Sequence, residues 1–202
     1  MEDWVQRALD KWPNVPAVYG WLSLDRRGRW LIRGEIISRP QIIDTINANY
    51  AADERGCWYF QNGPQRGYMA LEYAPLILRT DADERLITHT GLPVQHASAA
   101  YLDEQGAVLL ATEHGPGVLD DAALPWALER LKQNSRAMDE AELASALDLA
   151  SGTPTGLSLH LDSGAVAVTR LDTMDAPAHL GFVRQPVPDT ASTQRGAEAS
   201  VR

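Results

Sequence analysis

Residues 53–79 combine aromatic rings with guanidinium, amide and carboxylate groups more densely than any other part of the chain. Aromatic faces can stack on a planar molecule, and arginine and amide side chains can bind its anionic or polar groups. This composition predicts a site for a small anionic or nucleotide-like ligand. The expected ligand-binding residues are Arg66 and Arg79 for anion contact, Trp58 or Tyr59 for stacking, Gln61 and Glu72 for orientation, and His89. The alternative is that Trp58 and Phe60 belong to the core, that Tyr59 is partly exposed, and that the charged side chains form a solvated face.

Groups suited to catalysis or metal binding are dispersed along the chain. The five histidines form no closely spaced pair, and a single cysteine cannot supply a zinc-type motif. Cys57 begins an apolar strand, which is typical of a buried structural thiol, although Arg55 nearby would favour a reactive one. The glycine-containing loop 113–117 is followed by Asp120 and Asp121, which would repel a phosphate. We therefore expect no catalytic residue, no metal and no cofactor.

Composition and charge indicate a globular protein of a reducing compartment. The chain has 202 residues, 45% of them hydrophobic, and its lone cysteine excludes a disulfide within the chain. Residues 81–150 carry thirteen acidic and four basic side chains, which accounts for the whole net charge of −9. A pI near 5.0 disfavours nucleic-acid binding. Because signal-peptide features and long apolar runs are lacking, we expect a cytoplasmic protein without membrane contact.

Hydrophobic periodicity and capping residues predict the secondary structure. Helices are expected where apolar residues recur at helical spacing behind a cap, and strands where short apolar runs lie between turn residues. The expected helices are 2–12, the segment after a Ser38–Gln41 capping box, the segment behind Asp120 or Asp121, and the segment behind an Asp139–Glu142 capping box. The expected strands are 21–25, 29–33, 57–61, 67–72, 76–79, 97–102, 107–112, 156–161 and 165–171, with a further short one near 85–90.

A twelve-residue pattern occurs twice, as LDRRGRWLIRGE at 24–35 and as LDEQGAVLLATE at 102–113. Asp at the start of a turn can accept backbone N–H bonds, and Gly at its end tolerates positive φ, so unrelated hairpins could also converge on this pattern. In both occurrences a helix follows the hairpin. We therefore predict an α+β fold of two similar halves, each a curved antiparallel sheet packed by one or two helices. The expected boundaries are 1–84 and 95–183, with a flexible tail at 184–202.

Short motifs in residues 21–76 resemble an uncharacterised bacterial family of unknown function. The matching residues are Gly28-Arg29-Trp30, Gly34, Arg39-Pro40, Asp53-Glu54-Arg55-Gly56, Pro64 and Glu72-Tyr73-Ala74-Pro75, with Tyr73 in place of an acidic residue. The resemblance implies two similar halves, the second superficially like a pleckstrin-homology domain, with a ligand site between them. It also implies a role in signal transduction with a nucleotide-like ligand. No activity is established for that family.

Three functions are consistent with these observations. The first is a non-enzymatic regulatory protein that binds a small ligand. The second is a hydrolase-type enzyme that uses Arg, Glu and His between the halves. The third is a protein-interaction module, whose acidic segment 81–150 would face a basic partner or the arginine-rich first half of a second copy in a homodimer.

Overall fold

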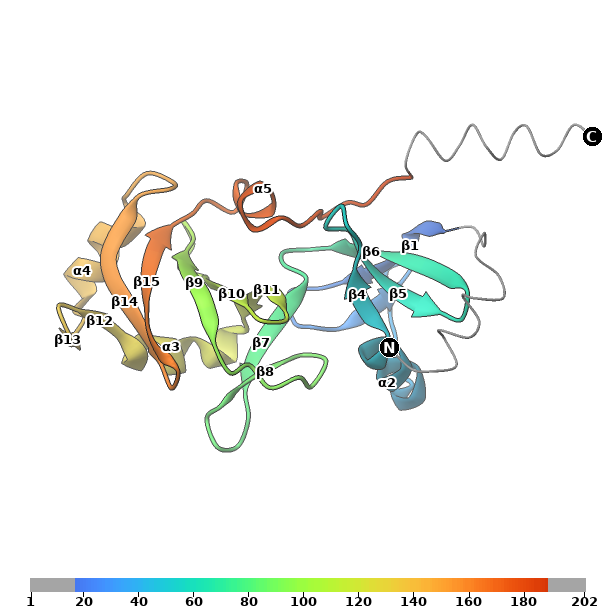
Figure 1. Ribbon diagram of the computed structural model, residues 1–202, viewed down its shortest axis with the longest axis horizontal. Coiled ribbons are helices and arrows are strands. Elements are labelled where there is room, and N and C mark those ends of the chain that lie inside the picture. The colour runs from blue at the N-terminus through green and yellow to red at the C-terminus, as the bar shows by residue number, and fades with distance from the viewer. Residues whose placement is uncertain (1–16, 189–202) are drawn as a thin grey trace, which may run out of the picture. The chain divides into compact units, whose positions relative to one another are not determined.

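A computed structural model describes residues 17–188, which form two compact units (Figure 1). Within the described part of the chain, the first unit consists of residues 17–24, 30–71 and 183–188. The second unit contains Glu72–Phe182 and the short segment Asp25–Arg29. The predicted helix 2–12 and most of the predicted tail lie outside the described residues. No helix in the described part of the chain is long and apolar enough to cross a membrane.

The first unit is a six-stranded sheet with one helix. In spatial order its strands run β3-β2-β1-β6-β5-β4, and only β1 and β6 are parallel. Leu24, Trp30 and Met69 lie on one face of this sheet and are buried, and Ile46 is the buried residue of the helix. The elements are β1 Val18–Leu24, β2 Trp30–Ile32, β3 Glu35–Ile36, α2 Pro40–Ala48, β4 Tyr50–Ala52, β5 Trp58–Asn62 and β6 Gln65–Leu71.

Helix α2 begins one residue later than the sequence predicts. Arg39 is its N-cap and makes no side-chain capping bond, so the predicted capping box starting at Ser38 is wrong. The physical reason is Pro40, whose fixed φ suits the first helical position and whose missing N–H needs no cap there. Ile46 is 1% exposed whereas Ile42 is 41% exposed, so the buried stripe of α2 is narrower than the expected isoleucine face.

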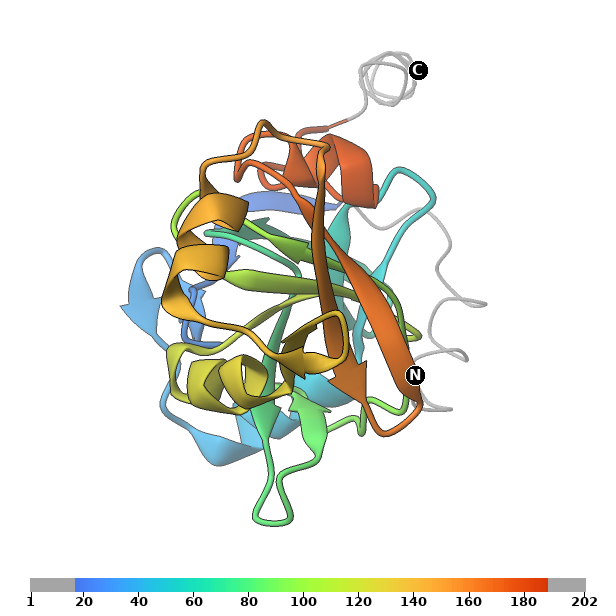
Figure 2. The same ribbon diagram turned by 90° about the vertical axis from the view of Figure 1, so that its left-hand side faces the viewer.

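The second unit is a nine-stranded sheet in the order β13-β12-β14-β15-β9-β10-β11-β7-β8. Helices α3 and α4 both pack against β14 (Figure 2), and residues of α5 join an apolar cluster with Tyr101 and Leu109. The strands are β7 Leu76–Thr80, β8 Leu86–Thr88, β9 Ala97–Leu102, β10 Val108–Thr112, β11 Gly115–Leu119, β12 Leu131–Gln133, β13 Arg136–Ala137, β14 Pro154–Leu161 and β15 Gly164–Arg170. The helices are η1 Asp121–Ala123, α3 Leu124–Arg130, α4 Glu140–Leu147 and α5 Ala176–Leu180.

Two predicted helix starts in the second unit are confirmed. The Asp120 side chain accepts the backbone N–H of Ala122 at 2.9 Å, at the start of η1. Asp139 and Glu142 form the predicted reciprocal capping box of α4. These caps satisfy backbone donors that a helix start leaves without partners.

The two sheets share one topology, which confirms an α+β fold with two similar halves. The order β3-β2-β1-β6-β5-β4 in the first unit corresponds to β11-β10-β9-β15-β14-β12 in the second. All five corresponding pairs have the same orientation, including the single parallel pair, β1–β6 or β9–β15. In the second unit β13 and α4 are inserted before β14, and β7 and β8 extend the sheet beyond β11.

The repeated sequence pattern forms the same turn between β1 and β2 of the first sheet and between the corresponding strands β9 and β10 of the second. The backbone N–H groups two and four residues after the Asp both bond its Oδ1, and the residue three positions after it has positive φ. Within the described residues this arrangement occurs four times, beginning at Asp25, Asp53, Asp81 and Asp103. Three of these turns have Gly at the positive-φ position, as expected for a residue without a Cβ.

Candidate functional site

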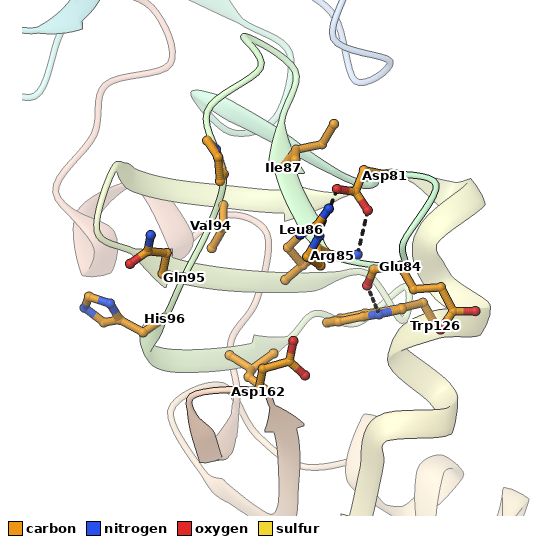
Figure 3. Close-up of a pocket in the computed structure, with 12 residues that line it drawn as sticks. Asp81, Glu84, Arg85, Leu86, Ile87, Val94, Gln95, His96, Trp126 and Asp162 are labelled. Atoms are coloured by element: carbon orange, nitrogen blue, oxygen red, sulfur yellow. Dashed lines mark hydrogen bonds and ion pairs between the residues drawn. The ribbon is translucent and has the colours of Figure 1, made fainter.

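The second unit contains a cavity of about 470 Å³, which Figure 3 shows. Three parts of the chain build it: the β7–β8 hairpin with the connection that follows, helix α3, and the turn between β14 and β15. Its apolar lining comes from Leu86, Ile87, Pro93, Val94, Trp126 and Leu161, and its polar lining from Asp81, Glu84, Arg85, Gln95, His96 and Asp162. An aromatic and aliphatic wall with a few polar groups is typical of a small-molecule site.

The β7–β8 turn fixes the carboxylate of Asp81 on one side of the cavity. Its Oδ1 accepts the backbone N–H groups of Asp83 at 2.8 Å and Arg85 at 2.9 Å, and its Oδ2 lies 3.3 Å from the Arg85 guanidinium. The backbone bond from Arg85 is the main reason that the pKa of Asp81 is below its usual value. Asp81 is therefore a weak base whose oxygens already have partners.

Trp126 reaches the cavity from α3 and is held in place by Glu84. Its indole Nε1 donates a 2.9 Å hydrogen bond to the carbonyl oxygen of Glu84. The Arg130 guanidinium lies 4.5 Å from the centroid of the indole ring and 3.4 Å from the Glu84 carboxylate. Trp126 thus has a fixed orientation, which lowers the entropic cost of stacking a ligand on it.

Glu84 is held in a backbone conformation that few side chains adopt. Its φ is +59°, at the turn position that is glycine in the turns starting at Asp25, Asp53 and Asp103. A left-handed backbone costs a non-glycine residue about 1–2 kcal/mol. Strained residues of this kind are concentrated at ligand-binding and catalytic sites.

Asp162 supplies a carboxylate on the opposite side of the cavity. It lies in the exposed turn between β14 and β15, and Figure 3 shows it below Leu86 and beside Trp126. Among the residues that the structure describes, nothing forms an ion pair or a hydrogen bond with its side chain. This carboxylate is therefore available to a ligand.

Two residues predicted from sequence, Glu72 and Arg79, line a second cavity of about 550 Å³ in the same unit. Glu72 accepts the backbone N–H of Arg26 at 2.9 Å, and Arg79 lies 3.5 Å from Asp120. Four guanidinium groups and four carboxylates face this cavity. They belong to Arg26, Arg27, Arg29, Arg79, Asp25, Glu72, Asp120 and Asp121. The formal charges of these eight side chains balance, so the lining as a whole carries no net charge.

His89 lies next to that second cavity but does not line it. Its Nδ1 accepts the backbone N–H of Ile77 at 3.2 Å, and its Cβ lies 2.9 Å from where a Cβ on Gly28 would be. Burial lowers the pKa of His89 to about 3, and the positive charge of Arg79 acts in the same direction. The ring is therefore neutral at physiological pH.

The remaining predicted residues belong to the first unit. Arg66 lies 4.4 Å from the Tyr59 ring centroid and donates a 3.1 Å hydrogen bond to Gln61, so these three side chains meet on one sheet face. Trp58 alternates with Tyr59 along β5 and packs on Tyr50 instead, with ring centroids 4.8 Å apart. The structure thus places the seven predicted residues in three groups: Glu72 and Arg79 with the nearby His89, then Arg66 with Tyr59 and Gln61, and finally Trp58 alone. The cavity of Figure 3 contains none of them.

Sequence reasoning missed Trp126 and Asp162. Trp126 precedes the buried Ala127 within α3, and Asp162 lies in a turn that the sequence indicates only as Asp-Ser-Gly. The acidic excess of residues 81–150 includes Asp81 and Glu84 of the cavity lining, but it signals neither Trp126 nor Asp162.

The chain belongs to the DUF2944 family, described as "Protein of unknown function (DUF2946)", which it matches over residues 1–187. Its fold is similar to the crystal structure of a DUF1285 family protein from Silicibacter pomeroyi DSS-3, with a TM-score of 0.52 and 13% identity over 77% of this chain and 84% of that one. A DUF1285 family protein from Shewanella baltica OS155 has a TM-score of 0.39 and 15% identity over 51% of this chain and 86% of that one. No curated protein matches the chain. The predicted resemblance to an uncharacterised family with two similar α+β halves is therefore confirmed.

Proposed function

We propose that this protein is a non-enzymatic regulatory protein that binds a small molecule in the cavity of its second unit. The observation that carries the proposal is the lining of that cavity, where an oriented indole and aliphatic side chains face a small number of polar groups. Its volume of about 470 Å³ suits a ligand of metabolite size.

The state of the polar groups favours binding over catalysis. Asp81 is a weakened base because backbone N–H groups already stabilise its charge. Arg85 pairs with Asp81 and with Asp83, so its guanidinium maintains the turn. These side chains hold the shape of the cavity, which a binding protein requires before its ligand arrives.

An anionic or nucleotide-like ligand is a second candidate, at the other cavity. The observation that favours it is the presence of Arg26 and Arg27, which form no ion pair with any described residue. Opposing them are Glu72 and Asp121, so such a ligand would have to displace or bridge these carboxylates. Under this proposal, AMP or inorganic phosphate would bind more weakly to an Arg26→Gln, Arg27→Gln double variant than to the wild type.

A thermal-shift screen of common metabolites tests the first proposal. Val94→Trp would fill the cavity, whereas Leu92→Trp adds the same ring two residues away at an exposed position outside the lining. A ligand at about 100 times its Kd stabilises the folded state by about 2.7 kcal/mol, which corresponds to roughly 5–10 °C for a chain of this size.

We expect a stabilising metabolite to raise the Tm of the wild type and of Leu92→Trp, and to leave that of Val94→Trp unchanged. Equal shifts in all three proteins would place the ligand elsewhere. A screen without any stabilising compound would contradict the proposed function.

A further inference from the structure

We infer that the ligand of the Figure 3 cavity carries a positive charge on an aromatic or apolar body, and that Asp162 is its counter-ion. This inference rests on the proposed function and narrows it to one chemical class, an arylalkyl amine or a similar organic cation. Three features carry it: the excess of carboxylates, the free state of one of them, and the position of the indole ring.

Carboxylates outnumber guanidinium groups three to one in the lining. Asp81, Glu84 and Asp162 supply the negative charges and Arg85 the positive charge. Arg85 is 64% exposed at its side chain and is already paired with two aspartates, so it does not offset the remaining charge at the opposite wall. Arg130, which lies outside the lining, balances Glu84, so the uncompensated negative charge of the lining is that of Asp162. The cavity is therefore expected to attract cations and to repel phosphates and carboxylates.

Among the described residues that line the cavity, one of the three carboxylates is available to bind a cation directly. Asp81 is saturated by its own turn, and Glu84 pairs with Arg130. Asp162 has no such partner among the described residues. A charge-assisted bond from an ammonium group to this carboxylate would therefore not have to break an existing interaction.

The apolar body of the ligand has a defined place beside that carboxylate. Figure 3 shows the Trp126 ring and Asp162 on neighbouring sides of the same space, with Leu86 above them. An aromatic ring can stack on or pack edge-to-face against an indole, and a cation near the ring gains a further attraction. Glu84 neutralises Arg130 at the indole, which reduces the repulsion that a second cation would meet there.

Three compounds with the same indole ring and different charges test this inference. Tryptamine is a cation, tryptophol is neutral and indole-3-acetate is an anion. Their affinities are measured by titration calorimetry for the wild type, for Asp162→Asn and for Asp148→Asn. The last variant removes one carboxylate by the same substitution, at an exposed residue that follows α4, lies outside the cavity lining and forms no ion pair with a described residue.

We expect tryptamine to bind the wild type and Asp148→Asn with equal affinity, and to bind Asp162→Asn about two- to fivefold more weakly, because Asp162 is exposed and water screens its ion pair with the ligand. Tryptophol should bind the wild type and Asp162→Asn with equal affinity, and this affinity should be lower than that of tryptamine for the wild type. Indole-3-acetate should be the weakest ligand, and should improve in Asp162→Asn.

The inference is overturned if tryptamine binds no better than the other two compounds, including the case in which none of the three binds, or if Asp162→Asn leaves tryptamine affinity unchanged. The proposed function is tested separately, because the metabolite screen with Val94→Trp and Leu92→Trp makes no assumption about ligand charge. A neutral or anionic metabolite that stabilises the wild type but not Val94→Trp would sustain the function and refute the charge class.

Discussion

The hydroxyl of Tyr73 donates a hydrogen bond to the carboxylate of Asp103, whose side chain is fully buried. Asp103 also accepts the Thr173 hydroxyl at 3.2 Å and two backbone N–H groups of its own turn. Burial raises the pKa of Tyr73, and the bond to Asp103 raises it further, so the phenol remains a donor. These bonds join the segment after β6 to the turn between β9 and β10.

Replacing Tyr73 by Phe should lower the free energy of unfolding by about 1.5–3 kcal/mol, because a buried carboxylate loses a donor. Tyr101→Phe is the matched control. Tyr101 belongs to the same buried cluster, and no described residue bonds its hydroxyl. Chemical denaturation of both variants measures the difference, and equal losses would show that the Tyr73–Asp103 bond contributes nothing specific.

Gly28 and Gly106 occupy the same position of corresponding turns, with φ of +71° and +84°. A Cβ at Gly28 would lie 2.9 Å from the Cβ of His89 and 3.0 Å from Nη2 of Arg79, whereas a Cβ at Gly106 would meet nothing within 4 Å. Both Ala variants should lose about 1–2 kcal/mol to backbone strain, and Gly28→Ala a further 1–3 kcal/mol to overpacking. Denaturation midpoints that do not separate the two variants would rule out the steric contribution.

Glu84→Gly should stabilise the protein by up to about 1 kcal/mol, because glycine adopts the positive φ of that position without strain. The carbonyl that accepts the Trp126 indole bond remains, and the lost ion pair with Arg130 is exposed and contributes little. Glu84→Gln removes the same charge and keeps the strain, so its Tm should not rise. A rise of equal size in both variants would assign the effect to charge.

The folded state should lose stability as pH falls from about 6.5 toward 3, since His89 stays neutral when folded and gains a proton when unfolded. The pKa of His89 is lower in the folded state, so the unfolded state binds more protons throughout this range and folding becomes less favourable. His89→Asn keeps an acceptor for the Ile77 N–H and does not titrate. The free energy of unfolding of His89→Asn should fall by a few kcal/mol less than that of the wild type over this range. Parallel pH profiles of the two proteins would show that His89 does not cause the loss.

The repeated pattern alone could not establish the repeated fold, because the same turn also occurs at Asp53 and Asp81, where it joins other strands. The turn is encoded locally by an Asp and a residue that tolerates positive φ, so it is readable from sequence. What makes the halves equivalent is the parallel pairing of β1 with β6 and of β9 with β15. Such pairing joins distant segments and leaves no local signal.

The candidate site was beyond prediction for the same reason. The β7–β8 hairpin, Trp126 and Asp162 are dispersed along the chain and come together only through the order of strands in the second sheet. The alternation along β5 did allow one inference, since Trp58 and Tyr59 had to face opposite sides. The predicted ligand-binding residues included side chains from both faces of β5, because residues close in sequence were assigned to one site.

Residues 25–29 belong to the second unit although strands of the first flank them, and the first unit resumes at Val183. The backbone N–H of Leu71 bonds the carbonyl of Arg184, so β6 acquires its last neighbour only from the far end of the described chain. During synthesis on the ribosome, the first unit therefore cannot be completed before the whole second unit has been made. The tip of the first hairpin and the last residue of β6 must wait for their final partners until more than a hundred further residues have emerged.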